Sequence, residues 1–180
     1  MEAICMGCKD SSCSFEPLRL KRRELNDLDV LIEMKYCGVC HSDLHIAAGH
    51  MENVLGKVEY PCVPGHELAG VVKQIGSKVT KFSVGDHIGV GCMVDSCLEC
   101  SKCMEGQEQK CSKQVGTYAG KDWSGRAQVP EREQTIGGYT NVMAGGPTGS
   151  RGIKTCPKWR FPYSHWELPS YPQNSWFINV

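Results

Sequence analysis

The chain has 180 residues, of which 41% are hydrophobic, and its 20 basic and 20 acidic side chains give a net charge of zero. This length accommodates one ordinary domain with a sizeable core, or one domain and a tail. The balanced charge argues against nucleic acid or an anionic membrane surface as a partner, because both favour a basic excess. No apolar run approaches the roughly 20 residues of a membrane span.

The chemical role expected of the twelve cysteines depends on whether the protein resides in a reducing or an oxidising compartment. The first fifteen residues lack the basic and apolar regions of a signal peptide, so we expect a cytoplasmic protein. In that reducing compartment, cysteines are more often thiols and metal ligands than disulfides.

The predicted elements of the first part of the chain are short strands. Residues 29–36, DVLIEMKY, alternate as a strand does, and a loop or short turn is expected over 37–45. Residues 61–76 become apolar and β-branched after a Pro/Gly-rich approach, and 81–91 contain a Gly-Asp turn that enters another strand. With no long helical periodicity before residue 140, we predict a mainly β, barrel-like domain over 1–141. In the first of these strands the alternation places Val30, Ile32, Met34 and Tyr36 on one face, and Glu33 and Lys35 on the other.

The composition changes near Val142. Five of the nine prolines and seven of the fourteen aromatic residues lie in 145–180, and neither a helical nor a strand period persists there. We therefore interpret 142–180 as an aberrant, disordered tail.

Four cysteines lie in the polar segment DSCLECSKCMEGQEQKC, at Cys97, Cys100, Cys103 and Cys111. Cys-x-x-Cys turns bring two sulfurs to one point, and a fourth nearby thiol completes a closed tetrahedral site of the structural zinc type. A disulfide pair or a redox Cys-x-x-Cys leaves the fourth thiol unexplained. We predict that zinc holds together the lobe 92–111, which has little apolar content of its own.

A second group of possible ligands is spread over two loops, CGVCHSDLH and GHELAG. Cys40 and His66 are 26 positions apart, and Glu67 follows His66 directly. Asp43 offers a carboxylate that could orient a ligating imidazole. Each element alone is a weak signal, because lone cysteines and histidines are more often structural.

Taken in order, CGVCHSDLH, VPGHELAGVV, VGDHIGVG, the cysteine lobe and GGY resemble the zinc-dependent medium-chain alcohol dehydrogenases. The resemblance covers roughly residues 18–141 and is nearest to the cinnamyl-alcohol-dehydrogenase-like branch. It implies a GroES-like catalytic domain, a partly open β-barrel, acting on a small-molecule alcohol or aldehyde with zinc and NADP. A homodimer is typical of that family.

The resemblance also implies roles for the second group of residues. Cys40 and His66 correspond to ligands of the catalytic zinc, Glu67 to a carboxylate near the metal that can exchange with water as a ligand, and Asp43 to a support of the zinc site. Zinc with an open position polarises the substrate oxygen during hydride transfer.

Three further residues take roles in proton transfer and cofactor binding by the same resemblance. Ser42 corresponds to the hydroxyl that receives the alcohol proton and passes it toward His45, and His41 faces the cofactor phosphates. Nothing in the sequence singles out His50 or His87. The remaining isolated cysteines are expected to be small buried side chains, namely Cys37, Cys62 and Cys92.

Two features of the family are missing. The third protein ligand is a cysteine in an apolar, helix-starting segment beyond GGY, whereas Cys156 lies in the charged sequence GIKTCPKWRF. Residues 144–150, AGGPTGS, lack the strand that precedes a dinucleotide-binding loop, so we expect no Rossmann domain and no NADP binding by this chain alone. We expect the four-cysteine site to fill with zinc and the second site to fill only partly.

Two interpretations therefore stay open. The chain is either the catalytic-domain portion of such an enzyme, not competent alone, or a stand-alone zinc-binding β-domain that serves as a binding or regulatory module. A truncated or frame-shifted gene model or an alternative transcript would account for the first.

Overall fold

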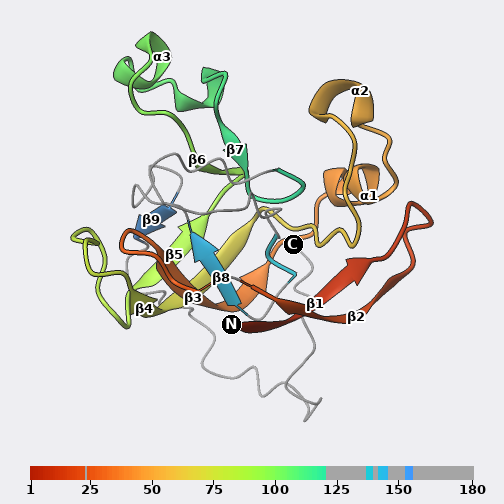
Figure 1. Ribbon diagram of the computed structural model, residues 1–180, viewed down its shortest axis with the longest axis horizontal. Coiled ribbons are helices and arrows are strands. Elements are labelled where there is room, and N and C mark those ends of the chain that lie inside the picture. The colour runs from red at the N-terminus through yellow and green to blue at the C-terminus, as the bar shows by residue number, and fades with distance from the viewer. Residues whose placement is uncertain (23, 121–136, 140–141, 146–152, 156–180) are drawn as a thin grey trace, which may run out of the picture.

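A computed structural model describes residues 1–22, 24–120, 137–139, 142–145 and 153–155 (Figure 1). In these residues no helix has the length and apolar character needed to cross a membrane. The elements in chain order are β1 (Glu2–Cys8), β2 (Phe15–Lys21), β3 (Val30–Cys37), α1 (His41–Ala47), α2 (Glu52–Leu55), β4 (Leu68–Ile75), β5 (His87–Val90), β6 (Met93–Asp95), α3 (Ser101–Met104), the 3-10 helix η1 (Glu108–Lys110), β7 (Val115–Gly116), β8 (Val142–Gly145) and β9 (Ile153–Thr155).

The centre of the domain is a five-stranded antiparallel sheet in the order β8-β3-β4-β5-β9. The strands β3, β4 and β5 were predicted from their alternating and β-branched residues, and the structure confirms them. The β1-β2 hairpin adds Ala3 and Cys5 to the main core, and Figure 1 shows this hairpin beside the sheet. Most of that core comes from the central strands, with Val30, Ile32, Val72 and Ile88 fully buried.

The strand β3 departs from the predicted alternation at its end. Tyr36 is 45% exposed, whereas Cys37 is 2% exposed. The prediction that Tyr36 shares a face with Val30, Ile32 and Met34, which are all buried, is therefore wrong. The cause is a register irregularity between Met34 and Tyr36, which pair with adjacent residues of β4. An extra residue in one strand moves every later side chain to the opposite face.

The segment predicted as a loop or turn contains the helix α1. Its first residue follows Cys40, whose backbone is extended with φ −116° and ψ 149°. The backbone N–H of Cys40 donates to the carboxylate of Asp43 at 3.0 Å. A contact of this kind, from the third helical residue back to the residue before the helix, is part of a capping box. It stabilises a helix that is too short to show a clear period in the sequence.

Two strands extend the sheet beyond residue 141. β8 pairs with β3, and β9 pairs with β5 at the other edge. The composition of 142–180 did not predict these strands. The remaining residues of that segment, and with them the prediction of a disordered tail, lie outside the described residues.

The segment 137–139 lies against the loop 63–65, where close approach requires glycine. Backbone hydrogen bonds join the two segments, from the N–H of Gly137 at 2.7 Å and from that of Gly138 at 3.0 Å. A Cβ atom on Gly138 would collide with Leu68 Cδ2 and would lie 2.8 Å from the sulfur of Cys37. This packing brings Tyr139 into the main core, where it is buried.

We predict that Gly138→Ala lowers the free energy of unfolding by about 1–3 kcal/mol, because the added methyl group overpacks a buried contact. Urea unfolding followed by circular dichroism, with zinc in excess, measures this change. Gly91→Ala is the matched control, since a Cβ there meets no atom within 4 Å. Equal stability of the two variants would contradict the packing argument.

Candidate metal centres

The cysteine lobe projects from the paired strands β6 and β7, as Figure 1 shows. It contains α3 and η1, and its buried cluster consists of cysteines alone among the described residues. Cys97, Cys103 and Cys111 are buried and Cys100 is partly buried. The lobe therefore has no aliphatic or aromatic core of its own, as the sequence predicted.

The four sulfurs of the lobe already have the spacing of a tetrahedral metal site. The distances are 3.5 Å from Cys111 to Cys97, 3.6 Å from Cys100 to Cys103, and 3.9 Å from Cys97 to Cys103. A tetrahedron with zinc–sulfur bonds of about 2.3 Å has sulfur–sulfur edges of about 3.8 Å. Each of the four cysteines offers one sulfur, and these sulfurs all lie within 4.8 Å of one another. The residues present therefore fit a structural zinc ion.

Hydrogen bonds within the lobe move the pKa values of Cys97 and Cys100 in opposite directions. The backbone N–H of Glu99, and after it the backbone N–H of Cys100, lower the pKa of Cys97 to about 6. The backbone N–H of Cys103 also lowers the pKa of Cys100, but hydrogen bonds with neighbouring sulfurs and burial outweigh it and raise that pKa to about 11. One sulfur is therefore a thiolate at neutral pH even before a metal binds.

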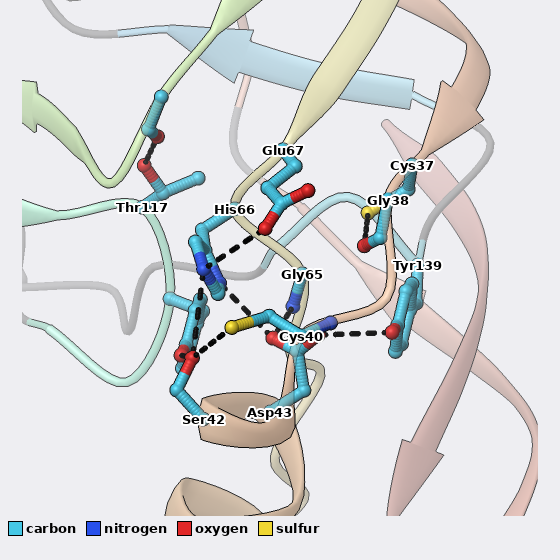
Figure 2. A network of polar contacts seen from close by, with 12 residues as sticks. Cys37, Gly38, Cys40, Ser42, Asp43, Gly65, His66, Glu67, Thr117 and Tyr139 are labelled. Atoms are coloured by element: carbon cyan, nitrogen blue, oxygen red, sulfur yellow. Dashed lines mark hydrogen bonds and ion pairs between the residues drawn. The ribbon is translucent and has the colours of Figure 1, made fainter. Parts of the chain in front are cut away.

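Cys40, His66 and Glu67 form the second group, with their ligand atoms within 4.8 Å of one another. Cys40 precedes α1, and His66 and Glu67 precede β4, so the group joins two separate loops (Figure 2). His66 is buried, with its Nε2 3.8 Å from a carboxylate oxygen of Glu67. Gly38 leaves room for Glu67, because a Cβ atom at Gly38 would collide with that carboxylate. Sulfur, imidazole nitrogen and carboxylate oxygen are all zinc ligands.

The carboxylate of Asp43, which is 1% exposed, holds this second group in place. Its Oδ1 lies 3.0 Å from Nδ1 of His66 and accepts the backbone N–H of Gly65 at 3.1 Å. Its Oδ2 accepts the backbone N–H of Cys40 and the hydroxyl of Tyr139, each at 3.0 Å. Since Nδ1 of His66 donates to the carboxylate, its Nε2 presents a lone pair to a metal, as in carboxylate–histidine–zinc arrangements.

The hydroxyl of Ser42 lies between the two proposed ligands. It is 3.2 Å from the sulfur of Cys40 and 3.5 Å from Nε2 of His66. Tyr118 donates its hydroxyl to Ser42 at 3.4 Å, and its ring lies 5.3 Å from that of His66. Burial raises the pKa of Tyr118 to about 12, so this phenol is a neutral donor at physiological pH.

The sequence analysis missed the two tyrosines of this site. Burial, followed by the nearby charge of Asp43, raises the pKa of Tyr139 far above its usual range, which keeps its hydroxyl protonated as a donor. The GGY motif contained Tyr139, but only as a marker of resemblance. Tyr118 carries no sequence signal, because its contact with Ser42 joins residues 76 positions apart.

The other predicted residues lie in different surroundings. His41 and His45 are exposed on α1 and stack on each other with ring centroids 4.9 Å apart. Cys37 and Cys62 are buried as predicted, and burial raises the pKa of each thiol to about 12. Cys92 is exposed, so the prediction of burial is wrong for it. Cys156 lies outside the described residues.

Comparison with known proteins gives one consistent match. The family profile described as the alcohol dehydrogenase GroES-like domain matches residues 26–145. Cinnamyl alcohol dehydrogenase 8 of Arabidopsis thaliana is 42% identical over 79% of this chain and 36% of its own length. Mannitol dehydrogenase of Petroselinum crispum is 47% identical over 71% of this chain and 34% of its own length.

Solved structures agree with these relatives. A cinnamyl alcohol dehydrogenase of Sorghum bicolor superposes with a TM-score of 0.76 at 35% identity, over 88% of this chain and 41% of its own. The CAD of Helicobacter pylori, complexed with NADP(H), gives a TM-score of 0.75 at 35% identity, over 86% and 41%. The chain spans 34–41% of the length of these relatives. It therefore belongs to the zinc-dependent medium-chain alcohol dehydrogenase family, in the cinnamyl-alcohol-dehydrogenase-like branch, and covers the GroES-like domain of that family.

Proposed function

We propose that this chain is the catalytic-domain portion of an NADP-linked, zinc-dependent alcohol dehydrogenase or aldehyde reductase. The observation that carries the proposal is the convergence of Cys40, His66 and Glu67 on one point, with the Ser42 hydroxyl beside it. A hydroxyl beside a metal position with an open site can serve as the first proton acceptor for a bound alcohol.

In this proposal Cys40 and His66 hold the catalytic zinc, and Glu67 supplies a third ligand that can yield to water. Zinc bound there supplies a Lewis acid that polarises the oxygen of an alcohol or aldehyde. Asp43 fixes the ring orientation of His66 and favours the tautomer that directs the lone pair of Nε2 at the metal position, through the 3.0 Å contact with Nδ1.

Ser42 is the proposed proton acceptor for the alcohol. Its hydroxyl lies beside the thiol and the imidazole of the second group, and the hydroxyl of Tyr118 donates to its oxygen. The hydroxyl of Ser42 in turn donates to the sulfur of Cys40 at 3.2 Å. His45 is proposed as the next proton carrier and His41 as a contact of the cofactor phosphates, both by family resemblance.

Hydride transfer further requires that a nicotinamide be held against the substrate. The chain matches 34–41% of the length of its relatives, and that portion is the GroES-like domain. We therefore propose that the 180 residues alone do not bind NADP and that a dinucleotide-binding domain must be supplied for activity. A homodimer, a small-molecule substrate and a cytoplasmic location are the corresponding proposals for the whole enzyme.

The two metal groups should differ in affinity for zinc. The lobe has four thiols, whereas the second group has one thiol, one imidazole and a half-exposed carboxylate. Changes outside the ligand shell alone cost about 10–100-fold in metal affinity, so a missing thiolate should cost at least that. After dialysis against a mild chelator, metal analysis should give close to one zinc per chain.

Two variants assign that zinc to a site. His66→Ala should leave the value nearly unchanged, whereas Cys103→Ser should lower it sharply and make residues 92–111 more sensitive to proteolysis, because metal binding stabilises the lobe. Two zinc ions that both resist dialysis would show that the second site is complete, and unchanged zinc in Cys103→Ser would contradict the four-thiolate site.

Cobalt in the second site tests the proposed catalysis without a cofactor. The dialysed chain, with its lobe filled by zinc, is titrated with Co²⁺, whose visible spectrum reports its ligands. Cinnamyl alcohol should change that spectrum in a saturable manner, because an open metal position accepts the hydroxyl oxygen. His66→Ala should abolish the response, and His87→Ala, at an exposed position in β5, should retain it.

The same cobalt experiment distinguishes the proposed enzymatic function from the alternative, a stand-alone zinc-binding module without catalysis. A cobalt spectrum that no alcohol alters would favour a non-catalytic zinc-binding module. With NADPH and cinnamaldehyde, the chain alone should show no turnover above the rate without protein. Saturable, zinc-dependent turnover would contradict the need for a second domain.

A further inference from the structure

Three histidines lie along one side of α1 and the turn that follows it. His41 and His45 are one helical turn apart, and His50 follows the end of the helix. All three are exposed. The nitrogen atoms Nδ1 of His45 and His50 are 3.2 Å apart, and the two ring centroids are 5.5 Å apart.

The distance between the two nitrogen atoms matches that of a chelating pair. With metal–nitrogen bonds of about 2.05 Å, nitrogen atoms 3.2 Å apart subtend an angle of about 100° at the metal. This angle lies between the octahedral and the tetrahedral ideal. Imidazole is a preferred ligand of zinc, copper and nickel, so the pair suits a divalent ion of this class.

The backbone at the end of α1 fixes this pair. The N–H of His50 donates to the carbonyl of His45 at 2.9 Å, and the N–H of Gly49 donates to that of Ile46 at 2.9 Å. Gly49 has φ +73°. These two bonds and the left-handed glycine form a Schellman motif, in which the residues at the positions of His45 and His50 are brought into contact. In this chain the contact joins two imidazoles.

A second imidazole also contacts the ring of His45. His41 stacks on it with an interplanar angle of 8° and a centroid distance of 4.9 Å. The helix itself is anchored by buried Ile46 and Ala47 and by the carboxylate of Asp43. Binding a metal therefore costs little side-chain entropy, because both imidazoles are already oriented toward each other.

We propose that His45 and His50 form a third metal site, a surface chelate for a divalent transition ion such as Zn²⁺ or Ni²⁺, with water completing the coordination. The two ligands belong neither to the cysteine lobe nor to the group of Cys40, His66 and Glu67, although His45 is also the proposed proton carrier. It does not depend on the proposed enzymatic function. The other possible explanation of the contact is a hydrogen bond between two neutral imidazoles, which water readily replaces on an exposed surface.

The test uses Ni²⁺ with the full chain, with zinc already in the lobe. Isothermal titration gives the affinity, and paramagnetic broadening of histidine resonances in a nitrogen-15-labelled sample gives the location. The signals of His45 and His50 should broaden together at low Ni²⁺. His45→Gln and His50→Gln should each weaken binding by at least about tenfold, since removing a ligand costs more than disturbing its surroundings.

Controls separate this site from the others. His87→Gln removes an exposed histidine of β5 and should leave the affinity unchanged. His66→Ala disables the second group and should also leave Ni²⁺ binding at the pair. Gly49→Ala keeps both imidazoles but strains the left-handed turn, so it should weaken binding. An affinity that does not fall in His50→Gln, or that disappears in His66→Ala, would overturn the proposal.

Discussion

The carboxylate of Asp43 is the contact on which the second metal group depends. A buried carboxylate is costly unless it is hydrogen-bonded, and this one is in contact with four donors from three parts of the chain. Through it, the start of α1, the loop before β4 and Tyr139 are held at fixed positions. The distance between the thiol of Cys40 and the imidazole of His66 is thus set by a residue that ligates nothing.

Tyr139 reaches this carboxylate from a position 96 residues away in sequence. It can do so because the segment 137–139 lies against the loop 63–65, where Gly138 packs on Leu68 and Cys37. The bulge in β3 turns Cys37 inward and so supplies part of that packing surface. An irregularity in a strand and a pair of glycines therefore both contribute to the position of the metal ligands.

Local features of the chain were predictable from sequence, whereas long-range ones were not. The strands β3, β4 and β5 and the cysteine lobe depend on residues close together, whose periodicity and spacing are visible directly. The roles of Tyr118 and Tyr139 depend on contacts over 76 and 96 positions. The pairing of His45 with His50 is local, but it follows from a helix end that was not expected within a predicted loop.

The contrast between a local and a distributed metal group has a consequence for synthesis of the protein. All four thiols of the lobe lie within residues 97–111, so the complete ligand set is available as soon as that segment leaves the ribosome. Cys40 and His66 emerge earlier, yet their geometry is complete only after Tyr139 has been made and donates its hydroxyl to Asp43. Under limiting zinc, a nascent chain therefore gains its lobe before its second site, although the ligands of the second site are synthesised first.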